Sequence, residues 1–375
     1  MRVLIATRSD ILTRRGGDTV QYLQYVKELA KLRVQATLDP SPRAAFHGFD
    51  LLHIGGVDRI LESLWFTLRA KRAGIRTVIS PIFHPRERVS QFDSTQRREH
   101  FQRWVYRLLP NALVELARSY GYAIHSRDLV RPAASLTVVG PERGRRLVLE
   151  AASCWCLIAS EEGDALRHTF HVRPKLERLI RNGVPDEFLS ARPGGDRHGI
   201  LIVGRIEARK NQLVILQALR GVGVPITVVG AQNQFHRKYC EAVLREIGAR
   251  PDITYVPEVA HDQMRDIYRR HSVHVSASWY EVAPLVDLEA AASGCAVVAT
   301  RAGYTNEYLG DSALYVDPVL GQEHLRATII EALDRAEELG KEGSIKATAY
   351  RWSDAAHGLR DVYHEILDNH HPSES

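Results

Sequence analysis

The alternation of short β-branched runs with longer helical stretches constrains the fold of this chain most strongly. The runs Val3–Thr7, Val34–Leu38, Leu51–Ile54, Thr77–Ile82 and Cys156–Ala159 are separated by segments long enough to hold helices. Parallel strands need such crossover segments, whereas antiparallel strands can be joined by tight turns. The pattern therefore predicts an α/β protein in which parallel sheets are covered by helices.

The alternation stops once and then restarts, which divides the chain. Residues 191–198 consist largely of glycine, proline and charged side chains, and we interpret them as a linker. The later apolar runs are Ile200–Val203, Ile226–Gly230, Ile253–Val256, Val273–Ser276, Ala296–Thr300 and Leu314–Val316. The sequence thus predicts two doubly wound, Rossmann-like domains, residues 1–190 and 199–350, that face a central cleft. In such sheets ligands bind beyond the carboxyl ends of the strands.

Composition and cysteine usage favour a soluble cytoplasmic protein. Of the 375 residues, 45% are hydrophobic and 25% are charged, as in ordinary globular domains, and no apolar run is long enough to span a bilayer. The first residues acquire charge too early for a signal peptide. The four cysteines lack the spacing of metal ligands or of a disulfide framework, so we expect reduced thiols.

The basic charge is concentrated in one segment. Residues 86–146 contain 12 Arg and 6 Asp or Glu, a balance of +6, whereas the whole chain carries +5. The segment also contains Phe92, Phe101, Trp104 and Tyr106. This combination predicts binding to a membrane surface or to an anionic acceptor, and the alternative is a solvated helix face with its aromatic side chains in the core. Because no nucleic-acid-binding motif is present, we expect no nucleic-acid partner.

Two glutamates flank a proline that suits the first turn of a helix. Pro284 lacks an N–H and has a helical φ, so it can open a helix without losing a hydrogen bond. The residues that then share one face are Leu285, Leu288, Glu289 and Ala292. A carboxylate on this apolar stripe needs a hydrogen-bonding partner, and ligand hydroxyls are suitable. Glu281 precedes the helix, where its N-terminus favours an anionic group. The alternative is a helix in another phase, with both carboxylates on the surface.

A glycine and two cations follow the first strand of the second domain. Gly204 ends the run Ile200–Val203, and Arg205 and Lys210 come directly after it. A glycine at a strand end lets the backbone approach a ligand, and two cations suit a diphosphate. Alone the signal is weak, because basic residues at the rim of a sheet are common.

Four motifs in this order resemble the retaining glycosyltransferases of the GT-B fold, family 4, also called group 1. They are Gly204-Arg-x4-Lys-Asn211, the Glu-x7-Glu pair of Glu281 and Glu289, Gly303-Tyr-Thr-Asn-Glu307, and Tyr350-Arg-Trp-Ser353. The last resembles the point where a C-terminal helix crosses back to the first domain, which implies that residues 351–375 join residues 1–190.

The resemblance implies a role for each matching residue. Arg205 and Lys210 would hold the diphosphate of a nucleotide-sugar donor, Glu289 the ribose hydroxyls, and Glu281 hydroxyls of the transferred sugar near its anomeric carbon. The remaining donor-binding residues implied are Gly17, Gly204, Glu258, Val259, Ala283, Leu285 and Val286. Among these, Gly17 would allow close approach of the first domain, Glu258 and Val259 would flank the base, and the helix N-terminus would supply amides.

The chain departs from the family pattern at three places, one of which is Gly303-Tyr304 in place of the usual Gly-Gly. The family commonly has Glu-Gly-Phe-Gly, whereas this chain has Glu281-Val-Ala-Pro284. The family histidine that follows a strand near the first quarter of the chain is replaced by Ser80, and His84 comes four residues later. His84 joins Arg205, Lys210 and Glu281 as a catalytic candidate, and a turn histidine is the alternative.

The resemblance implies a retaining transfer of sugar from a nucleotide-diphosphate donor, with no obligatory metal or cofactor. The acceptor would be a glycan, a lipid-linked molecule or a small molecule, in bacterial surface polysaccharide or glycoconjugate synthesis. Location would be cytoplasmic, at the inner face of the membrane if the basic segment binds lipid. The alternatives are an epimerase or phosphorylase on the same fold, or a paralogue that binds nucleotide sugars without turnover.

Overall fold

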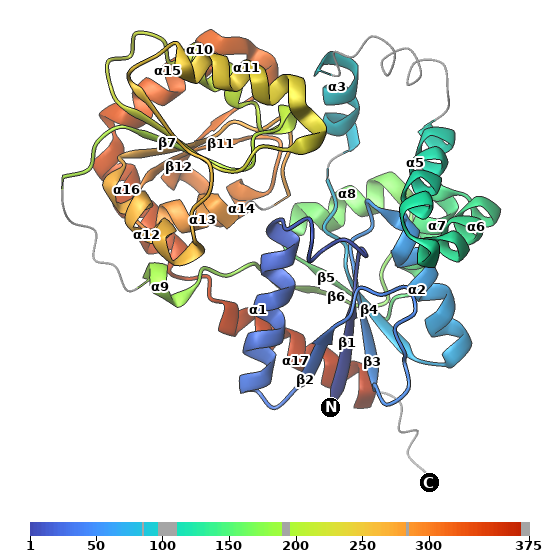
Figure 1. Cartoon of the computed structure of the whole chain (residues 1–375). Coiled ribbons are helices and arrows are strands. Elements are labelled where there is room, and N and C mark those ends of the chain that lie inside the picture. The colour runs from blue at the N-terminus through green and yellow to red at the C-terminus, as the bar shows by residue number, and fades with distance from the viewer. Residues whose placement is uncertain (85, 97–110, 190–195, 283–284, 369–375) are drawn as a thin grey trace. The chain divides into compact units, whose positions relative to one another are not determined.

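Two compact units make up the chain, each built around one six-stranded sheet (Figure 1). The computed structural model describes residues 1–84, 86–96, 111–189, 196–282 and 285–368. The first unit takes its described residues from 1–83, 97–182 and 352–375, and the second from 84–96 and 183–351. Every pairing between the named strands is parallel, which confirms the predicted α/β class.

The first sheet has the strand order β2-β1-β3-β4-β5-β6. Its strands are β1 (Arg2–Ala6), β2 (Gln35–Leu38), β3 (Leu51–Gly55), β4 (Arg76–Ser80), β5 (Cys154–Leu157) and β6 (Glu177–Leu179). The helices of this unit are α1 (Gly17–Lys31), α2 (Ile60–Ala73), α5 (Asn111–His125), η1 (Arg127–Leu129), α6 (Val130–Val139), α7 (Pro141–Ala151), α8 (Ser160–Phe170) and α17 (Trp352–Asp368).

Successive residues of a central strand serve the two faces of this sheet. Leu52 and Ile54 of β3 belong to the apolar cluster that contains α2, as the two-residue period of a strand requires. His53, between them, is fully buried among aromatic rings, and its ring nitrogens lie 2.6 Å from the Tyr363 hydroxyl and 2.9 Å from the Ser80 hydroxyl. Burial lowers the pKa of His53 to about 3, so this histidine is a neutral core residue that ties α17 to the sheet.

The second sheet has the strand order β12-β11-β10-β7-β8-β9. Its strands are β7 (Ile200–Val203), β8 (Ile226–Val229), β9 (Ile253–Val256), β10 (Val273–Ser276), β11 (Ala296–Thr300) and β12 (Ala313–Val316). The helices are α3 (Arg86–Gln96), α9 (Asp186–Leu189), η2 (Ala208–Lys210), α10 (Gln212–Ala218), η3 (Gln234–His236), α11 (Arg237–Gly248), α12 (His261–Arg270), α13 (Leu285–Ala292), α14 (Thr305–Leu309), η4 (Gly310–Ser312), η5 (Pro318–Leu320), α15 (Gly321–Asp334) and α16 (Ala336–Ala347).

Both faces of the second sheet are buried, as parallel sheets require. Ile200 and Ile202 of β7 pack in a cluster with α10, α11 and α15. Leu201, between them, packs in a second cluster with α12, α13 and α14. None of the helices within the described ranges is long and apolar enough to cross a bilayer.

The division into units differs from the expected boundaries at one helix. His84–Gln96 was expected in the first domain but groups with the second unit. The reason is long-range packing, because the ring of Phe92 lies 6.1 Å from that of Trp279 and Arg88 makes two hydrogen bonds, of 3.1 and 2.8 Å, to Asp317. The units also divide after residue 182 rather than 190, and residues 190–195 of the expected linker lie outside the described residues.

Each sheet contains one switch point, where neighbouring strands are not consecutive in the chain and the winding reverses. In the first sheet it lies between β1 and β3, and in the second between β7 and β10. The loops after the carboxyl ends of such strand pairs form the usual ligand crevice of an open α/β sheet. The two switch points are therefore where each unit is expected to meet a ligand.

Candidate functional site

Beside the switch point of the second sheet, glycine brings together the loops that follow β7 and β8. Gly204 follows β7 and Gly230 follows β8, with φ of +144° and +147°, a region that side chains other than glycine rarely adopt. A Cβ on Gly230 would lie 2.2 Å from the carbonyl oxygen of Gly204. Glycine at these positions allows the loops to pass one another closely, as a backbone that meets a ligand often does.

The loop after β7 carries three cations within six residues, Arg205, Arg209 and Lys210. It ends at Asn211, which adopts a left-handed conformation with φ +61°. The side-chain amide of Asn211 donates to the carbonyl oxygen of Ala277 at 3.2 Å. Because Ala277 follows β10, this hydrogen bond joins the two loops of the switch point and fixes the cations at its rim.

Glu281 lies between two of these cations and is only 6% exposed. Its Oε1 is 2.5 Å from Nζ of Lys210 and 2.8 Å from Nη1 of Arg209. Burial alone would raise the pKa of Glu281, but the charges of Arg209 and Lys210 hold it well below its ordinary value. A Cβ on Gly303 would lie 3.1 Å from the Glu281 Cβ and carbonyl oxygen, so this glycine leaves room for the backbone and the base of the side chain of Glu281. Glu281 is therefore a fixed, ionised hydrogen-bond acceptor.

A second buried carboxylate, Glu207, completes the charged cluster. It accepts hydrogen bonds from Arg209 and from the side chain of Asn233, both at 2.9 Å, and Arg205 lies 3.5 Å away. Burial opposes ionisation of Glu207, but Arg209 and Arg205 lower its pKa below the ordinary value. With Lys210, the cluster contains three cations and two carboxylates, a net charge of +1. Such a balance favours an anionic ligand.

Glu289 lies on α13, where the sequence predicts a carboxylate on an apolar stripe. Its neighbours on that stripe, Leu285, Leu288 and Ala292, are all buried, and Glu289 itself is 6% exposed. The hydroxyl of Tyr268 donates to Glu289 Oε2 at 3.3 Å. A carboxylate can accept about four hydrogen bonds, so this site is suited to ligand hydroxyls as well.

The same helix holds a buried carboxylate that sequence reasoning missed. Asp287 is fully buried and accepts hydrogen bonds from the hydroxyls of Ser276 at 2.6 Å and Thr305 at 3.0 Å, while Nε2 of His274 is 3.3 Å away. Helix periodicity gave no signal for it, because α13 is enclosed on nearly all sides. These internal partners indicate that Asp287 anchors α13 to β10 and α14.

His84 lies beside this cluster within the second unit. Its ring is 5.2 Å from that of Tyr280 in an edge-to-face arrangement, and Phe92 contacts the same tyrosine at 5.7 Å. The guanidinium of Arg209 lies over the Tyr280 ring at 5.5 Å and donates to its carbonyl oxygen at 3.0 Å. Tyr280 directly precedes Glu281 in the chain. His84 is thus close to Glu281.

The other sequence-predicted residues are distributed as follows. Arg205 is 40% exposed at the rim and pairs with Glu207 rather than with Glu281. Leu285 and Val286 form the first described turn of α13, whereas Ala283 and Pro284 lie outside the described residues. Glu258 and Val259 follow β9, the edge strand, and are not at the switch point. Gly17 begins α1 in the first unit.

Two members of the cluster were not predicted from the sequence. Arg209 contacts the same oxygen of Glu281 as Lys210 does, and Glu207 links Arg209 to Arg205. The available signal was the density of cations after β7, since Arg209 stands directly before Lys210. Burial alone would lower the pKa of Arg209, but Glu281 and Glu207 raise it above its ordinary value.

The switch point of the first sheet is also lined by charges. The side chains that share it are Arg8, Arg14, Arg59, Asp10, Asp18 and Glu62. Arg8 contacts Asp18 at 2.6 Å and Asp10 at 2.9 Å, while Arg59 contacts Asp10 at 2.7 Å and the fully buried Glu62 at 2.6 Å. With three arginines against three carboxylates, this network is electrically balanced.

Much of the second unit, which contains the charged cluster, is similar in sequence to a known protein family. The family model described as "Glycosyl transferases group 1" matches residues 197–335. A D-inositol 3-phosphate glycosyltransferase from Streptomyces griseus is 26% identical over 313 residues, which cover 72% of this chain and 64% of that protein. A protein of the same name from Arthrobacter is matched over 45% of its length. The chain thus spans less than two thirds of the length of these relatives.

Solved structures match over both units. Sucrose-phosphate synthase from Thermosynechococcus elongatus has a TM-score of 0.73 at 16% identity, covering 98% of this chain and 100% of that one. An Anabaena protein crystallised with UDP-glucose has a TM-score of 0.66 at 14% identity, covering 97% of this chain and 100% of that one. At such identities the likeness shows the fold alone.

Proposed function

We propose that this chain, which belongs to the group 1 glycosyltransferases and has their GT-B fold, transfers a sugar from a nucleoside-diphosphate donor to an acceptor hydroxyl. The observation that carries the proposal is the cluster at the switch point of the second sheet. There Glu281 is buried between Arg209 and Lys210, and Glu289 lies buried on the helix that follows. Together they offer positive charge for a diphosphate and carboxylates for sugar hydroxyls.

Arg209 and Lys210, the two cations that pair with Glu281, have different roles in the proposed reaction. Arg209 is held from both sides by Glu281 and Glu207, so it keeps Glu281 in place. Lys210 has Glu281 as its described ion-pair partner and a flexible stem. The donor diphosphate then competes for Lys210, with Arg205 at the exposed rim as the second cation. Glu281 remains ionised beside Arg209 and accepts hydroxyls of the transferred sugar.

Glu289 would bind the ribose of the donor. Tyr268 donates a hydrogen bond to one of its oxygens and so orients the carboxylate, which is compatible with further bonds from two ribose hydroxyls. The amides at the start of α13, those of Leu285 and Val286, would contribute at the phosphate or sugar. Residues Glu258 and Val259, after β9, would flank the base, and Gly17 would allow close approach of the first unit.

We propose retention at the anomeric carbon by a front-face mechanism. The bond from the anomeric carbon to the donor phosphate oxygen breaks while the bond to the acceptor oxygen forms on the same face. The leaving phosphate oxygen takes the proton of the acceptor hydroxyl, so no external base is required. Arg205 and Lys210 stabilise the charge that develops on the leaving diphosphate without an obligatory metal. His84, beside Tyr280, is the candidate that contacts the reacting sugar.

The similar proteins suggest which donors and acceptors should be tested first. Because an Anabaena protein of the same fold was crystallised with UDP-glucose, UDP-sugars are the first donors to test. Because relatives are named for D-inositol 3-phosphate, a phosphorylated cyclitol is the first acceptor to test, beside glycans and lipid-linked molecules. A role in bacterial surface glycoconjugate synthesis in the cytoplasm would follow from a lipid-linked acceptor.

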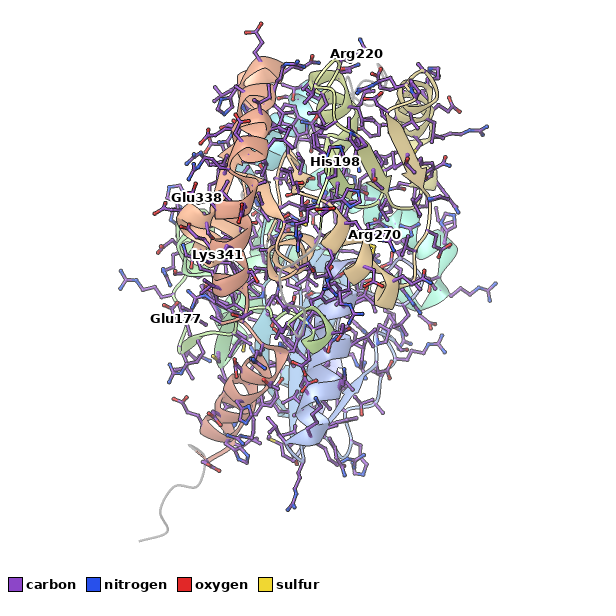
Figure 2. All side chains as sticks on the ribbon, turned by 90° about the vertical axis from the view of Figure 1, so that its left-hand side faces the viewer. Glu177, His198, Arg220, Arg270, Glu338 and Lys341 are labelled. Carbon is purple, nitrogen blue, oxygen red and sulfur yellow. The ribbon has the colours of Figure 1, made fainter. Side chains whose placement is uncertain are left out.

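Ligand-induced stabilisation tests the donor site. A nucleoside diphosphate at about 100 times its dissociation constant should stabilise the chain by about 2.7 kcal/mol, and Lys210→Ala should remove this shift. The matched control is Arg220→Ala, because Arg220 is an exposed cation of the same unit that points outward and pairs only with Glu246 among its described ion pairs (Figure 2). Stabilisation of both variants alike would refute the site.

Product analysis separates transfer from the alternatives. A transferase forms product only when an acceptor is present, apart from slow hydrolysis of the donor. An epimerase would convert the donor without any acceptor, and a phosphorylase would require inorganic phosphate. A non-catalytic paralogue would bind the donor and leave it unchanged across an acceptor panel.

A further inference from the structure

Two neighbouring helices of the first unit present an unusual number of exposed apolar side chains. Leu113, Tyr120 and Ile124 on α5, and Val130 and Val138 on α6, are all exposed, with Ile124 at 82% and Val138 at 86%. They are five of the thirteen large exposed hydrophobic residues in the described part of the chain. Single exposed apolar side chains are ordinary, whereas a contiguous group marks an interaction site.

These five residues form one surface, called here the α5–α6 surface. Residues 113, 120 and 124 are separated by seven and eleven positions and so share one face of α5, and 130 and 138 share one face of α6. The two helices pack against each other (Figure 1). The Tyr120 hydroxyl lies 3.0 Å from the hydroxyl of Thr137, which joins the exposed faces across the helix boundary.

The charge around this surface is positive because arginines outnumber acidic residues on its helices. Glu115 and Glu142 both pair with Arg145, and Asp128 pairs with Arg43. The exposed arginines on the same helices and on η1 and α7 are Arg118, Arg127, Arg131, Arg143 and Arg146. Residues 111–146 contain six Arg and three acidic residues, a balance of +3.

The structure also shows which part of the basic segment, residues 86–146, carries exposed apolar side chains. Phe92, one of its six aromatic residues, is buried against Trp279 and Tyr280 in the second unit. Phe101, Trp104 and Tyr106 lie outside the described residues, and Tyr120 and Tyr122 lie on α5. Within the described part of the segment, the exposed apolar side chains are therefore those of the α5–α6 surface, which the sequence pattern did not single out.

We propose that the α5–α6 surface docks on the face of a bilayer that contains anionic lipid. The apolar side chains protrude from two adjacent helices, with Ile124 82% and Val138 86% exposed, so the surface suits the acyl boundary of a membrane better than an inserted peptide. Arginines at the border can reach lipid phosphates while their stems cover apolar area. This inference goes beyond the proposed transfer reaction and does not depend on it.

Vesicle flotation of the full chain tests the proposal. We expect binding to vesicles of equal parts phosphatidylcholine and phosphatidylglycerol at ~0.1 M salt, much weaker binding to phosphatidylcholine alone, and a decline towards ~1 M salt, where the Debye length falls to about 3 Å. The double variants Ile124→Glu with Val138→Glu, and Arg127→Glu with Arg131→Glu, should each bind at least ~10-fold less.

The matched control is Ile345→Glu, on α16 of the second unit. Ile345 is 65% exposed, but its surroundings include the outward-pointing charges of Glu338 and Lys341 (Figure 2), so this variant should bind vesicles as the wild type does. Lack of binding by the wild type would overturn the proposal, and so would unchanged binding by both double variants or equal loss in the control. Donor-induced stabilisation measured without lipid should persist in all variants, which separates this test from the test of the transfer reaction.

Discussion

Each of the two sheets of this protein has one switch point, and the charged side chains at the two switch points differ in their net charge. At the first, three arginines face three carboxylates, Asp10 pairs with all three arginines, and Glu62 is fully buried. At the second, three cations face two carboxylates, and Arg205 is left 40% exposed at the rim. The same topological position holds a charge-balanced network in one unit and a cluster with one excess positive charge in the other.

The difference indicates that charged side chains at the same position of this fold can either stabilise a loop or bind a ligand. A balanced network uses its charges to fix a loop and has little to gain from an incoming anion. A cluster with excess positive charge attracts an anionic ligand, which suits the binding of a diphosphate. If the two clusters differ in function as they do in charge, substitutions in the second should impair donor binding and those in the first should impair stability.

The largest expected effect is loss of transfer in Lys210→Ala. If Lys210 leaves Glu281 for the donor diphosphate, its removal should lower kcat/KM by about 10²- to 10³-fold, as measured with a purified, folded variant. Arg220→Ala, which removes an exposed cation elsewhere in the second unit, should have near-normal kinetics. Activity within a few-fold of wild type in Lys210→Ala would contradict the assignment.

Glu281→Gln should affect turnover more than donor binding. The amide retains the shape of the side chain but cannot accept hydroxyls as a carboxylate does, so kcat should fall by about 10²-fold. The dissociation constant of the nucleoside diphosphate should stay the same or decrease, because Lys210 loses its competing partner. A weaker diphosphate affinity with unchanged kcat would reverse the proposed roles.

Arg8→Ala should destabilise the first unit and leave the donor site intact. Its removal leaves Asp18 and Asp10 without a partner they both contact, which should cost about 2 kcal/mol of unfolding free energy. Chemical denaturation measures this loss, and donor-induced stabilisation should be unchanged. A variant of normal stability that no longer binds donor would show that the first switch point is a ligand site.

The smallest effect is expected for Tyr268→Phe. Loss of the hydroxyl that donates to Glu289 should cost about 1 kcal/mol of donor binding, or roughly a five-fold increase in KM, with kcat little changed. Glu289→Ala should raise KM by much more. Equal effects of the two variants would indicate that Tyr268 itself contacts the donor.

The sequence predicted the parallel sheets and Glu289 for a common physical reason. Buried parallel strands are short apolar runs, and a carboxylate on an apolar helix stripe stands out against the helical period, so both signals are local. Arg209 and Glu207 lie in a loop without periodicity, and their roles depend on contacts with residues far along the chain. The attachment of α3 to the second unit depends likewise on Phe92 meeting Trp279.

Asp287 shows a different limit of sequence reasoning. Its burial follows from the enclosure of α13 by α14 and α16, which removes the polar face that an amphipathic helix normally has. The Asp287 carboxylate, which an amphipathic helix would place on its solvent side, is therefore buried and accepts hydrogen bonds from two hydroxyls. Periodicity alone cannot distinguish this helix from one at the surface.

The most direct test of the central claim compares the affinities of a nucleoside diphosphate and the matching monophosphate by calorimetry. If the excess charge of the second switch point binds the diphosphate, the wild type should prefer it by at least about 10-fold, or 1.4 kcal/mol. Lys210→Ala should lose most of this preference, and Arg8→Ala should keep it. An undiminished preference in folded Lys210→Ala, or its loss in Arg8→Ala, would contradict the account.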